Sequence, residues 1–314
     1  MKKLSLFLPM LFLLLLLLPA CSNNEDALAE SGQDALLVYA SFYPMYDFAA
    51  KIGGEKAQVH NMVPAGTEPH SWEPTAKDIT ALEKADVFIY NGAGMEHWVP
   101  TVLPVLNNKK LLVVEAAKGI ALLTAEGHQH EEGEKEAETG PHNDPHVWLS
   151  PMNAKQQLET IKIAFQQADP ANSAYYEANY AKYAAELDAL HQEYLETISP
   201  LPNKDIVVAH QAFSYLCKEY GLNQIAIEGL SADSEPDPAR MAEIIKFAKG
   251  KKLKYIFFEE LVSPKVAETI AKEVGAQTAV LNPLGALSEA QILAGSDYFS
   301  VMRENLAALK LALQ

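Results

Sequence analysis

The sequence predicts an α/β protein with two lobes, each a parallel sheet covered by helices, joined by one long rigid helix. Short apolar runs rich in β-forming residues alternate with helical patterns in each half of the 314-residue chain. This alternation is typical of parallel sheets with helices on both faces. A single amphipathic pattern separates the halves, and the chain is long enough for two domains of ordinary size.

In the first half, residues 35–168, the predicted strands cover residues 35–42, 57–63, 85–91 and 111–117. One helix is predicted over 75–85. Another is predicted from Ser150 to residue 168, because Ser150 suits the N-cap and Pro151 the first helical position.

The second half, residues 201–314, repeats this order, with predicted strands over residues 205–210, 223–230, 255–260 and 278–283. Helices are predicted over 238–250 and 263–275. Each of these patterns ends in a glycine, Gly250 or Gly275, which suits the position after the last helical turn. No residue-level repeat is visible, so the two-fold theme is architectural.

The segment 169–200 between the halves predicts a single helix. Its larger apolar residues recur at intervals of 4, 3, 4, 3 and 4 and therefore share one face; they are Tyr176, Tyr180, Tyr183, Leu187, Leu190 and Tyr194. From Pro170 to Ile198 such a helix extends about 40 Å, at about 1.5 Å per residue. We expect a stiff strut that limits how far the lobes close.

The N-terminus predicts export across a membrane. Lys2 and Lys3 precede an apolar run over 6–18, and LPAC follows at 18–21. A short basic start, an apolar stretch too short to span a bilayer and a small-residue cleavage site are typical of a secretory signal.

The cysteine directly after the small residue resembles a lipobox. Residues 1–20 are therefore expected to be removed and Cys21 to be lipidated, which anchors the protein at the extracellular face of the cell membrane. Residues 21–34 then form a polar tether. An ordinary signal peptide that contains a cysteine is the alternative.

Charge and cysteine content narrow the choice of partners and metal ligands. Removing residues 1–20 takes away two lysines and no acids, so the formal charge moves from −16 to −18. Such an acidic surface argues against nucleic acid as a partner and suits the concentration of cations. With Cys21 lipidated, Cys217 alone remains, so neither an internal disulfide nor a cysteine metal site is expected.

An acidic loop over 124–142 contains His128, His130 and His142 among glutamates and glycines. Such a polar run buries too little apolar area to order itself, and we expect it to be mobile. Its histidines are predicted to bind metal loosely, which does not require order.

His70, His146 and His210 share a different context. Each follows a predicted strand or lies beside prolines at the start of a helix. In α/β proteins ligands bind outside the carboxyl ends of strands. Three imidazoles suit a tetrahedral zinc site with one position left to fill. Asp144, beside His146, suits either an acceptor for a ring N–H or a helix N-cap.

The remaining histidines predict ordinary structural roles. His60 lies in a strand pattern. His97 precedes Trp98 and is expected to pack with it, with an approach to the cleft as the alternative. His191 falls on the polar face of the linking helix, where we expect it to be solvated.

Five motifs carry a resemblance to a known family: EPHSWEPT, NDPHVWLSP, VVAHQAFSYL, FFEELVSPKVAETIAKEVGA and VLNPLG, together with the acidic histidine loop. Over nearly the whole mature chain the sequence resembles the metal-binding solute-binding lipoproteins of zinc and manganese ABC transporters, and it is most similar to the zinc branch. The resemblance implies a metal site between two lobes. It also implies a monomeric receptor that captures Zn²⁺ with high affinity and delivers it to an ABC transporter permease.

The resemblance assigns the metal ligands to His70, His146 and His210. Manganese-type relatives have glutamate at the third position. Imidazole there favours zinc as the transported ligand, whereas a harder oxygen donor favours manganese. A manganese receptor of the same family is therefore the less favoured alternative.

The fourth ligand departs from the family pattern. Relatives place an aspartate at the position of Asn282 or a glutamate at that of Gly285, and this chain has neither. Three neutral imidazoles would leave the charge of the ion uncompensated, which is costly in a dry cleft. Water, Glu68, Glu259 and Glu260 are the candidates for this position.

Two other classes of protein are consistent with parts of this pattern. A secreted zinc hydrolase also uses three histidines and a water, with Glu68 as a conceivable base. A surface protein of the cell adhesion class would share the lipid anchor. The chain contains no HExxH motif, no serine–histidine–aspartate signal and no glycine-rich phosphate loop, so a receptor rather than an enzyme is predicted.

Overall fold

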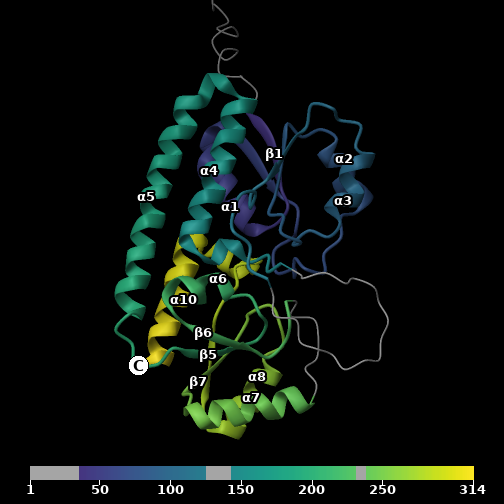
Figure 1. The fold of residues 1–314 in the computed structure, drawn as a ribbon. Helices are drawn as coiled ribbons and strands as arrows, with labels where there is room; N and C mark the ends of the chain where they lie inside the picture. The colour runs from purple at the N-terminus through teal and green to yellow at the C-terminus, as the bar shows by residue number, and fades with distance from the viewer. Residues whose placement is uncertain (1–34, 125–142, 231–237) are drawn as a thin grey trace, which may run out of the picture. The chain divides into compact units, whose positions relative to one another are not determined.

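A four-stranded parallel sheet organises the first half of the chain in the computed structural model, which describes residues 35–124, 143–230 and 238–314 (Figure 1). The strand order is β2-β1-β3-β4. The strands are β1 (Leu36–Ala40), β2 (Ala57–Asn61), β3 (Val87–Tyr90) and β4 (Leu112–Glu115). Each is hydrogen-bonded in parallel to its neighbour, as the alternating pattern predicts.

Helices cover both faces of this sheet. They are α1 (Tyr43–Gly53), α2 (Ala76–Leu82), α3 (Val99–Val102) and α4 (Pro151–Ala168), with short 3-10 turns η1 (Gly54–Lys56), η2 (Leu103–Val105) and η3 (Val147–Leu149). Side chains of β3 point alternately to the two faces. Val87 and Ile89 belong to the main core with α1 and α4, whereas Phe88 packs in a second cluster with Leu82 and Trp98.

The second half contains two parallel strand pairs, in which β5 (Asp205–Val208) pairs with β6 (Asn223–Ala226) and β7 (Tyr255–Phe258) with β8 (Gln277–Val280). Strands β5 and β7 lie side by side. The helices are α6 (Ser214–Tyr220), α7 (Pro238–Lys251), α8 (Lys265–Val274), α9 (Glu289–Leu293) and α10 (Tyr298–Leu313). The predicted fold class, with parallel sheets and covering helices in each half, is confirmed.

The predicted linking helix is α5 (Ser173–Ile198), which follows the 3-10 turn η4 (Pro170–Asn172). It therefore begins three residues later than predicted. Its 26 residues span about 39 Å, and it packs against α1, α4 and α10 (Figure 1). Among its predicted apolar-face residues, Tyr176, Leu187, Leu190 and Tyr194 are fully buried. The domain boundaries proposed around it remain a prediction.

Several contacts join the two halves beside the ends of the strands. Trp148, just before α4, donates its indole N–H to the carbonyl of Pro283 at 2.8 Å. Tyr298 of α10 donates to the carbonyl of Trp148 at 2.7 Å, and the amide of Gly66 donates to the carbonyl of Leu287 at 2.9 Å. The Gly66 bond fixes the loops that follow β2 and β8 against each other, and the two Trp148 bonds tie the segment before α4 to the second half.

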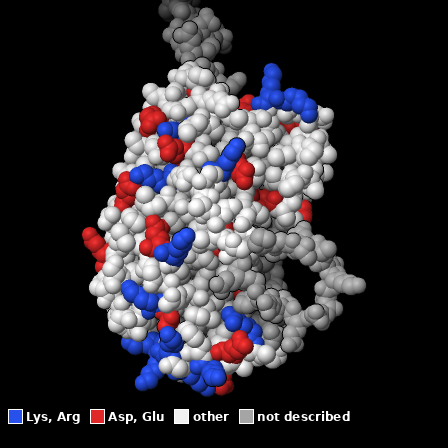
Figure 2. Space-filling model, in the orientation of Figure 1, with Lys and Arg blue, Asp and Glu red and all other residues white. Residues whose placement is uncertain are grey.

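The surface charge is mixed on the face that Figure 2 shows. Acidic and basic side chains are interspersed there, and Lys and Arg side chains gather at the end of the molecule that carries α7 (Figure 2). The acidic excess of the sequence is thus not concentrated in one patch on this face. Within the described ranges, no helix is both long and apolar enough to traverse a membrane.

The packing of α5 predicts a large loss of stability from a single truncation. Leu187→Ala removes a fully buried side chain and is expected to lower the free energy of unfolding by about 2–5 kcal/mol. Leu311→Ala, at a position of α10 that is 51% exposed, is the control and should change it by less than about 0.5 kcal/mol. Urea denaturation followed by circular dichroism measures both; equal, small losses would contradict the packing of α5.

Candidate metal site

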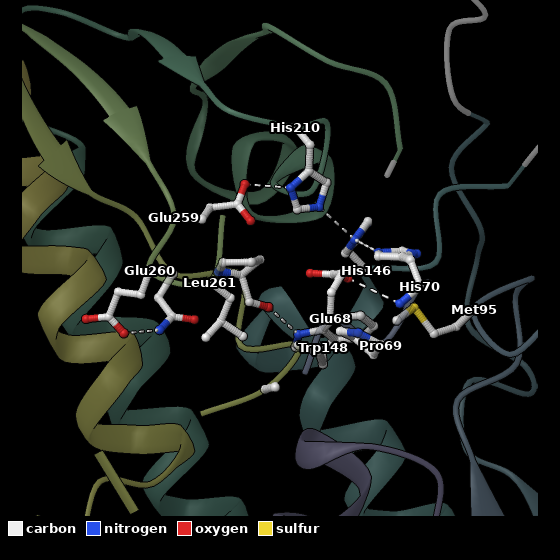
Figure 3. Close-up of a pocket in the computed structure, with 14 residues that line it drawn as sticks. Glu68, Pro69, His70, Met95, His146, Trp148, His210, Glu259, Glu260 and Leu261 are labelled. Atoms are coloured by element: carbon white, nitrogen blue, oxygen red, sulfur yellow. Dashed lines mark hydrogen bonds and ion pairs between the residues drawn. The ribbon is translucent and has the colours of Figure 1, made fainter. Parts of the chain in front are cut away.

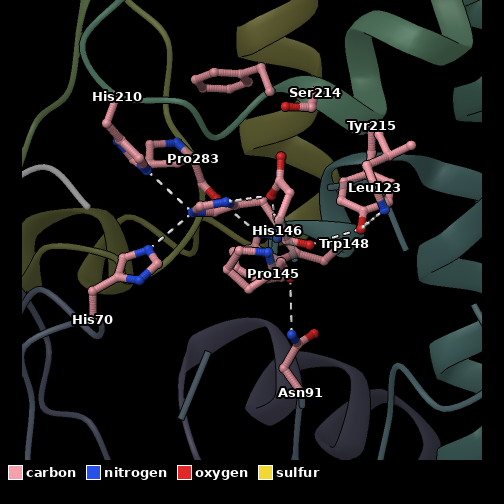
Figure 4. A network of polar contacts seen from close by, with 12 residues as sticks. His70, Asn91, Leu123, Pro145, His146, Trp148, His210, Ser214, Tyr215 and Pro283 are labelled. Carbon is pink, nitrogen blue, oxygen red and sulfur yellow. Dashed lines mark hydrogen bonds and ion pairs between the residues drawn. The ribbon is translucent and has the colours of Figure 1, made fainter. Parts of the chain in front are cut away.

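Three histidine rings meet where the two halves face each other (Figures 3 and 4). The Nε2 atom of His146 lies 3.0 Å from Nε2 of His70 and 3.2 Å from Nε2 of His210. One nitrogen from each ring lies within 4.8 Å of the other two. The sequence predicted these three histidines together, and the structure brings them together.

Each ring comes from a different part of the chain. His210 lies two residues beyond β5, and His70 lies in the loop that follows β2. His146 directly precedes η3 and the start of α4. Each of His70 and His210 follows the carboxyl end of a strand in its own sheet, where ligands of α/β proteins bind.

Two of the rings are held from behind by carboxylates. Asp144 Oδ1 lies 2.9 Å from Nδ1 of His146, and Glu259 Oε1 lies 2.5 Å from Nδ1 of His210. A carboxylate accepts hydrogen bonds, so this network assigns the ring proton to Nδ1 in both histidines. Their Nε2 atoms then direct bare lone pairs at the centre of the cluster.

This arrangement fits a metal ion. Facing lone pairs repel each other at 3.2 Å in a buried setting, and only a shared proton or a cation between them relieves the repulsion. Ligand bonds of about 2.0–2.1 Å in a tetrahedral zinc site place ligand nitrogens about 3.3–3.4 Å apart. The two distances from Nε2 of His146 need only a few tenths of an ångström of expansion.

Burial and neighbouring charges shift the pKa values of the three histidines in different directions. Burial, followed by repulsion from neighbouring histidines, lowers the pKa of His70 well below its ordinary value. Burial also lowers the pKa of His146, and Asp144 partly offsets it. For His210 burial, the largest single effect, also lowers the pKa, but the Glu259 carboxylate, with smaller contributions from Glu68 and Glu228, outweighs it, so the pKa of His210 is raised. Of the three rings, His210 therefore takes up a proton most readily.

The carboxylates considered for a fourth ligand lie in different places. Glu68 lines the cavity and accepts the amide N–H of His70 at 3.1 Å (Figure 3). Glu259 accepts from Nδ1 of His210, on the side of the ring opposite to the histidine cluster. Glu260 is exposed and accepts from the side-chain amide of Asn282 at 3.3 Å. Among the described residues, the group with mutually close ligand atoms contains the three histidines and no carboxylate.

The cavity in front of the rings is small. Its volume is about 20 Å³, and its wall includes Met95, Trp148 and Pro283 besides the histidines. A space of this size holds about one water-sized particle. Asn282 and Gly285, the positions where relatives were expected to carry a carboxylate, also line it.

The other predicted histidines have mixed outcomes. His60 lies in β2, as predicted, stacked on Tyr39. His97 was expected to pack, which is wrong: its side chain is 52% exposed. His191 was expected to be solvated, which is also wrong, because its ring is 20% exposed and contacts Tyr220 where α6 packs against α5.

Several predicted positions lie outside the described residues, namely Cys21, His128, His130 and His142. Of the two roles left open for Asp144, the structure shows the ring acceptor. The N-cap of α4 is Ser150, as predicted. The contact of Glu259 with His210 was missed, since the sequence separates the two residues by 49 positions.

Comparison with known proteins identifies a family and relatives whose names refer to zinc. The family model described as zinc-uptake complex component A, periplasmic, matches residues 38–312. The chain is 42% identical to the zinc-binding lipoprotein AdcA of Streptococcus pneumoniae over 99% of its own length, but it spans only 61% of that relative. It is 42% identical to the high-affinity zinc uptake system protein ZnuA of Bacillus subtilis, covering 94% of this chain and 93% of ZnuA.

The same likeness appears among solved structures. The Zn(II)-bound ZnuA-like domain of Streptococcus pneumoniae AdcA superposes with a TM-score of 0.77 at 40% sequence identity. The match covers 89% of this chain and 99% of that domain.

The carboxylate behind His210 predicts a measurable shift. Because Glu259 raises the pKa of His210, Glu259→Gln is expected to lower that pKa. Glu260→Gln, which alters the adjacent exposed carboxylate, should leave it unchanged. Titration of the histidine ring protons by nuclear magnetic resonance in the metal-free chain measures both. Equal responses of His210 to the two substitutions would show that Glu259 does not hold the ring.

Proposed function

Because the chain belongs to the zinc-uptake complex component A family, we propose that it captures Zn²⁺ outside the cytoplasm and passes it to an ABC transporter permease. The observation that carries this proposal is the cluster of three imidazole nitrogens within 4.8 Å of one another, from three separate parts of the chain. The names of relatives at 42% identity, a zinc-binding lipoprotein and a zinc uptake system protein, support it.

In this proposal His70, His146 and His210 bind the ion through Nε2. By accepting from Nδ1, Asp144 and Glu259 place the proton of the neutral ring on Nδ1 and orient two of these Nε2 atoms toward the ion, as carboxylates behind metal-bound histidines do. They also place two negative charges next to the double positive charge of the ion. We assign the fourth position to water, with Glu68 at the cavity wall as the alternative.

Zinc is favoured over manganese by the donor set. Three imidazoles suit Zn²⁺, whereas Mn²⁺ prefers carboxylate, carbonyl and water oxygens. The Zn(II)-bound structure of a relative with 40% identity supports the same choice.

A receptor also fits the site better than a zinc hydrolase. A cavity of about 20 Å³ leaves no room beside the ion for an ester or peptide. Glu68, the conceivable base, has one carboxylate oxygen engaged with the amide of His70. The family resemblance to transport receptors points in the same direction.

The proposal also covers how the protein is attached to the membrane and how zinc reaches its site. Lipidation of Cys21 would anchor a monomeric receptor at the extracellular face of the membrane, near its permease. The tether 21–34 would give it reach, and His128, His130 and His142 would bind zinc loosely before it enters the site. The description of relatives as lipoproteins supports the anchor.

Removal of any one ring should weaken zinc binding strongly. His70→Ala, His146→Ala and His210→Ala are each expected to raise the dissociation constant by more than about 100-fold, because even partners behind metal ligands contribute about 10–100-fold. His60→Ala, on β2 and outside the cavity, is the matched control. Competition with a zinc chelator measures these constants. Wild-type affinity in any of the three variants would remove that ring from the proposed ligand set.

Zinc affinity should fall as the pH is lowered. Binding requires neutral imidazole, and the raised pKa of His210 means that proton competition begins above the ordinary histidine value of about 6.5. Below that pKa the affinity should drop by about tenfold per pH unit for each proton displaced. Chelator competition across this pH range tests it. An affinity that stays constant down to pH 6 would contradict ligation by these histidines.

A further inference from the structure

A histidine–carboxylate pair lies outside the cavity and has no role in the proposed site. His97 Nε2 lies 2.7 Å from Glu73 Oε1. The two side chains are 52% and 65% exposed, so both reach solvent. Exposed ion pairs contribute little to stability, and such a pair is therefore free to exchange its contact for another ligand.

The packing of two tryptophans fixes where this pair stands. Trp72 and Trp98 are the chain neighbours of Glu73 and His97, and their rings meet edge to face with centroids 5.7 Å apart. Trp98 is buried. The two backbone segments are therefore held side by side beneath the pair, so that its two side chains start from fixed positions.

The same two segments also form part of the wall of the metal cavity. His70 lies three residues before Glu73, and Met95 lies two residues before His97; both line the cavity (Figure 3). Each segment thus runs from the cavity to the exposed pair within a few residues. Charge on His97 also acts on His70 and contributes to its lowered pKa, which is consistent with this proximity.

We propose that Glu73 and His97 form an outer, weaker Zn²⁺ site at the rim of the cavity, from which the ion moves on to the three inner histidines. The inference rests on the proposed function, because it assigns the pair a step in loading that site. Imidazole and carboxylate are both zinc ligands. Opening the pair from 2.7 Å to about 3.3 Å admits an ion at normal bond lengths.

The difference between the two sites gives the direction of transfer. The outer site offers two protein ligands in solvent, with water completing the coordination. The inner site offers three ligands, two of them 1% exposed and backed by carboxylates. An ion held at the rim is therefore bound less tightly than one at the inner site, and it is close to His70, the half-buried member of the three.

Binding at the outer site can be observed separately from binding elsewhere. The full chain is first loaded with one equivalent of Zn²⁺ and then titrated with excess Zn²⁺ while the ring nitrogens of each histidine are followed by nuclear magnetic resonance. The His97 signals should shift and saturate at micromolar to millimolar zinc. In Glu73→Gln the midpoint should rise about tenfold, as expected for a lost partner. His60 is the internal control and should not shift.

Loading kinetics test the transfer step. In His97→Ala and Glu73→Gln, the rate at which micromolar Zn²⁺ fills the inner site should fall by about tenfold. Each substitution removes a ligand that concentrates the ion at the entrance, and such local concentration raises association rates by at least about this factor. The equilibrium affinity of the inner site should stay unchanged. Stopped-flow mixing measures the rate, and His60→Ala is the matched variant.

Three results would overturn the outer site. His97 signals that stay fixed while other histidines respond would reduce the pair to a surface ion pair. Unchanged loading rates would remove its role in transfer, and a fall in equilibrium affinity would make His97 part of the inner site. Failure of the proposed function is separate: it would appear as tight zinc binding that survives His70→Ala, whatever the response of His97.

Discussion

The site depends on two buried hydrogen bonds that take the ring proton away from the metal side. Asp144 and Glu259 each accept from Nδ1 of a histidine that is 1% exposed, and both Nε2 lone pairs are thereby turned toward the same point. In a buried cluster this is unfavourable until a proton or a cation lies between the rings. The fold therefore holds facing imidazole nitrogens whose repulsion a metal ion would relieve.

To hold that arrangement, the two halves of the chain must keep fixed positions relative to each other. His70 belongs to the loop after β2, whereas His210 and Glu259 follow β5 and β7. The bond from the Trp148 indole to the carbonyl of Pro283 ties the segment that carries His146 to the second half. Helix α5 packs against helices of both halves along its length. A ring can turn only if some of this packing is disturbed, which keeps the geometry of the site fixed.

The sequence predicted the parts of this structure that depend on local pattern. Alternating apolar runs predicted the parallel strands, and the three histidines stood out because each lies beside a strand end or a helix start. It did not predict contacts set by packing between distant segments. Glu259 looked like a candidate ligand, yet β7 places it behind His210. His97 looked like a packing residue, but Trp98 fills the core and His97 projects into solvent.

The absence of a carboxylate at positions 282 and 285 has a physical explanation in the contacts of Asn282 and Gly285. The side chain of Asn282 accepts from the amide of Leu284 at 2.7 Å and donates to the Glu260 carboxylate at 3.3 Å. An ionised aspartate at this position could make only the first of these bonds and would face the Glu260 charge. A Cβ at Gly285 would lie 3.0 Å from Pro69, which leaves little room for a glutamate. In the proposed site, charge compensation would come from Asp144 and Glu259 behind the rings. Such a site would offer the ion neutral imidazoles, with the negative charge on carboxylates that are hydrogen-bonded to the far side of the rings. This donor set favours a late transition metal such as zinc over ions that need oxygen donors.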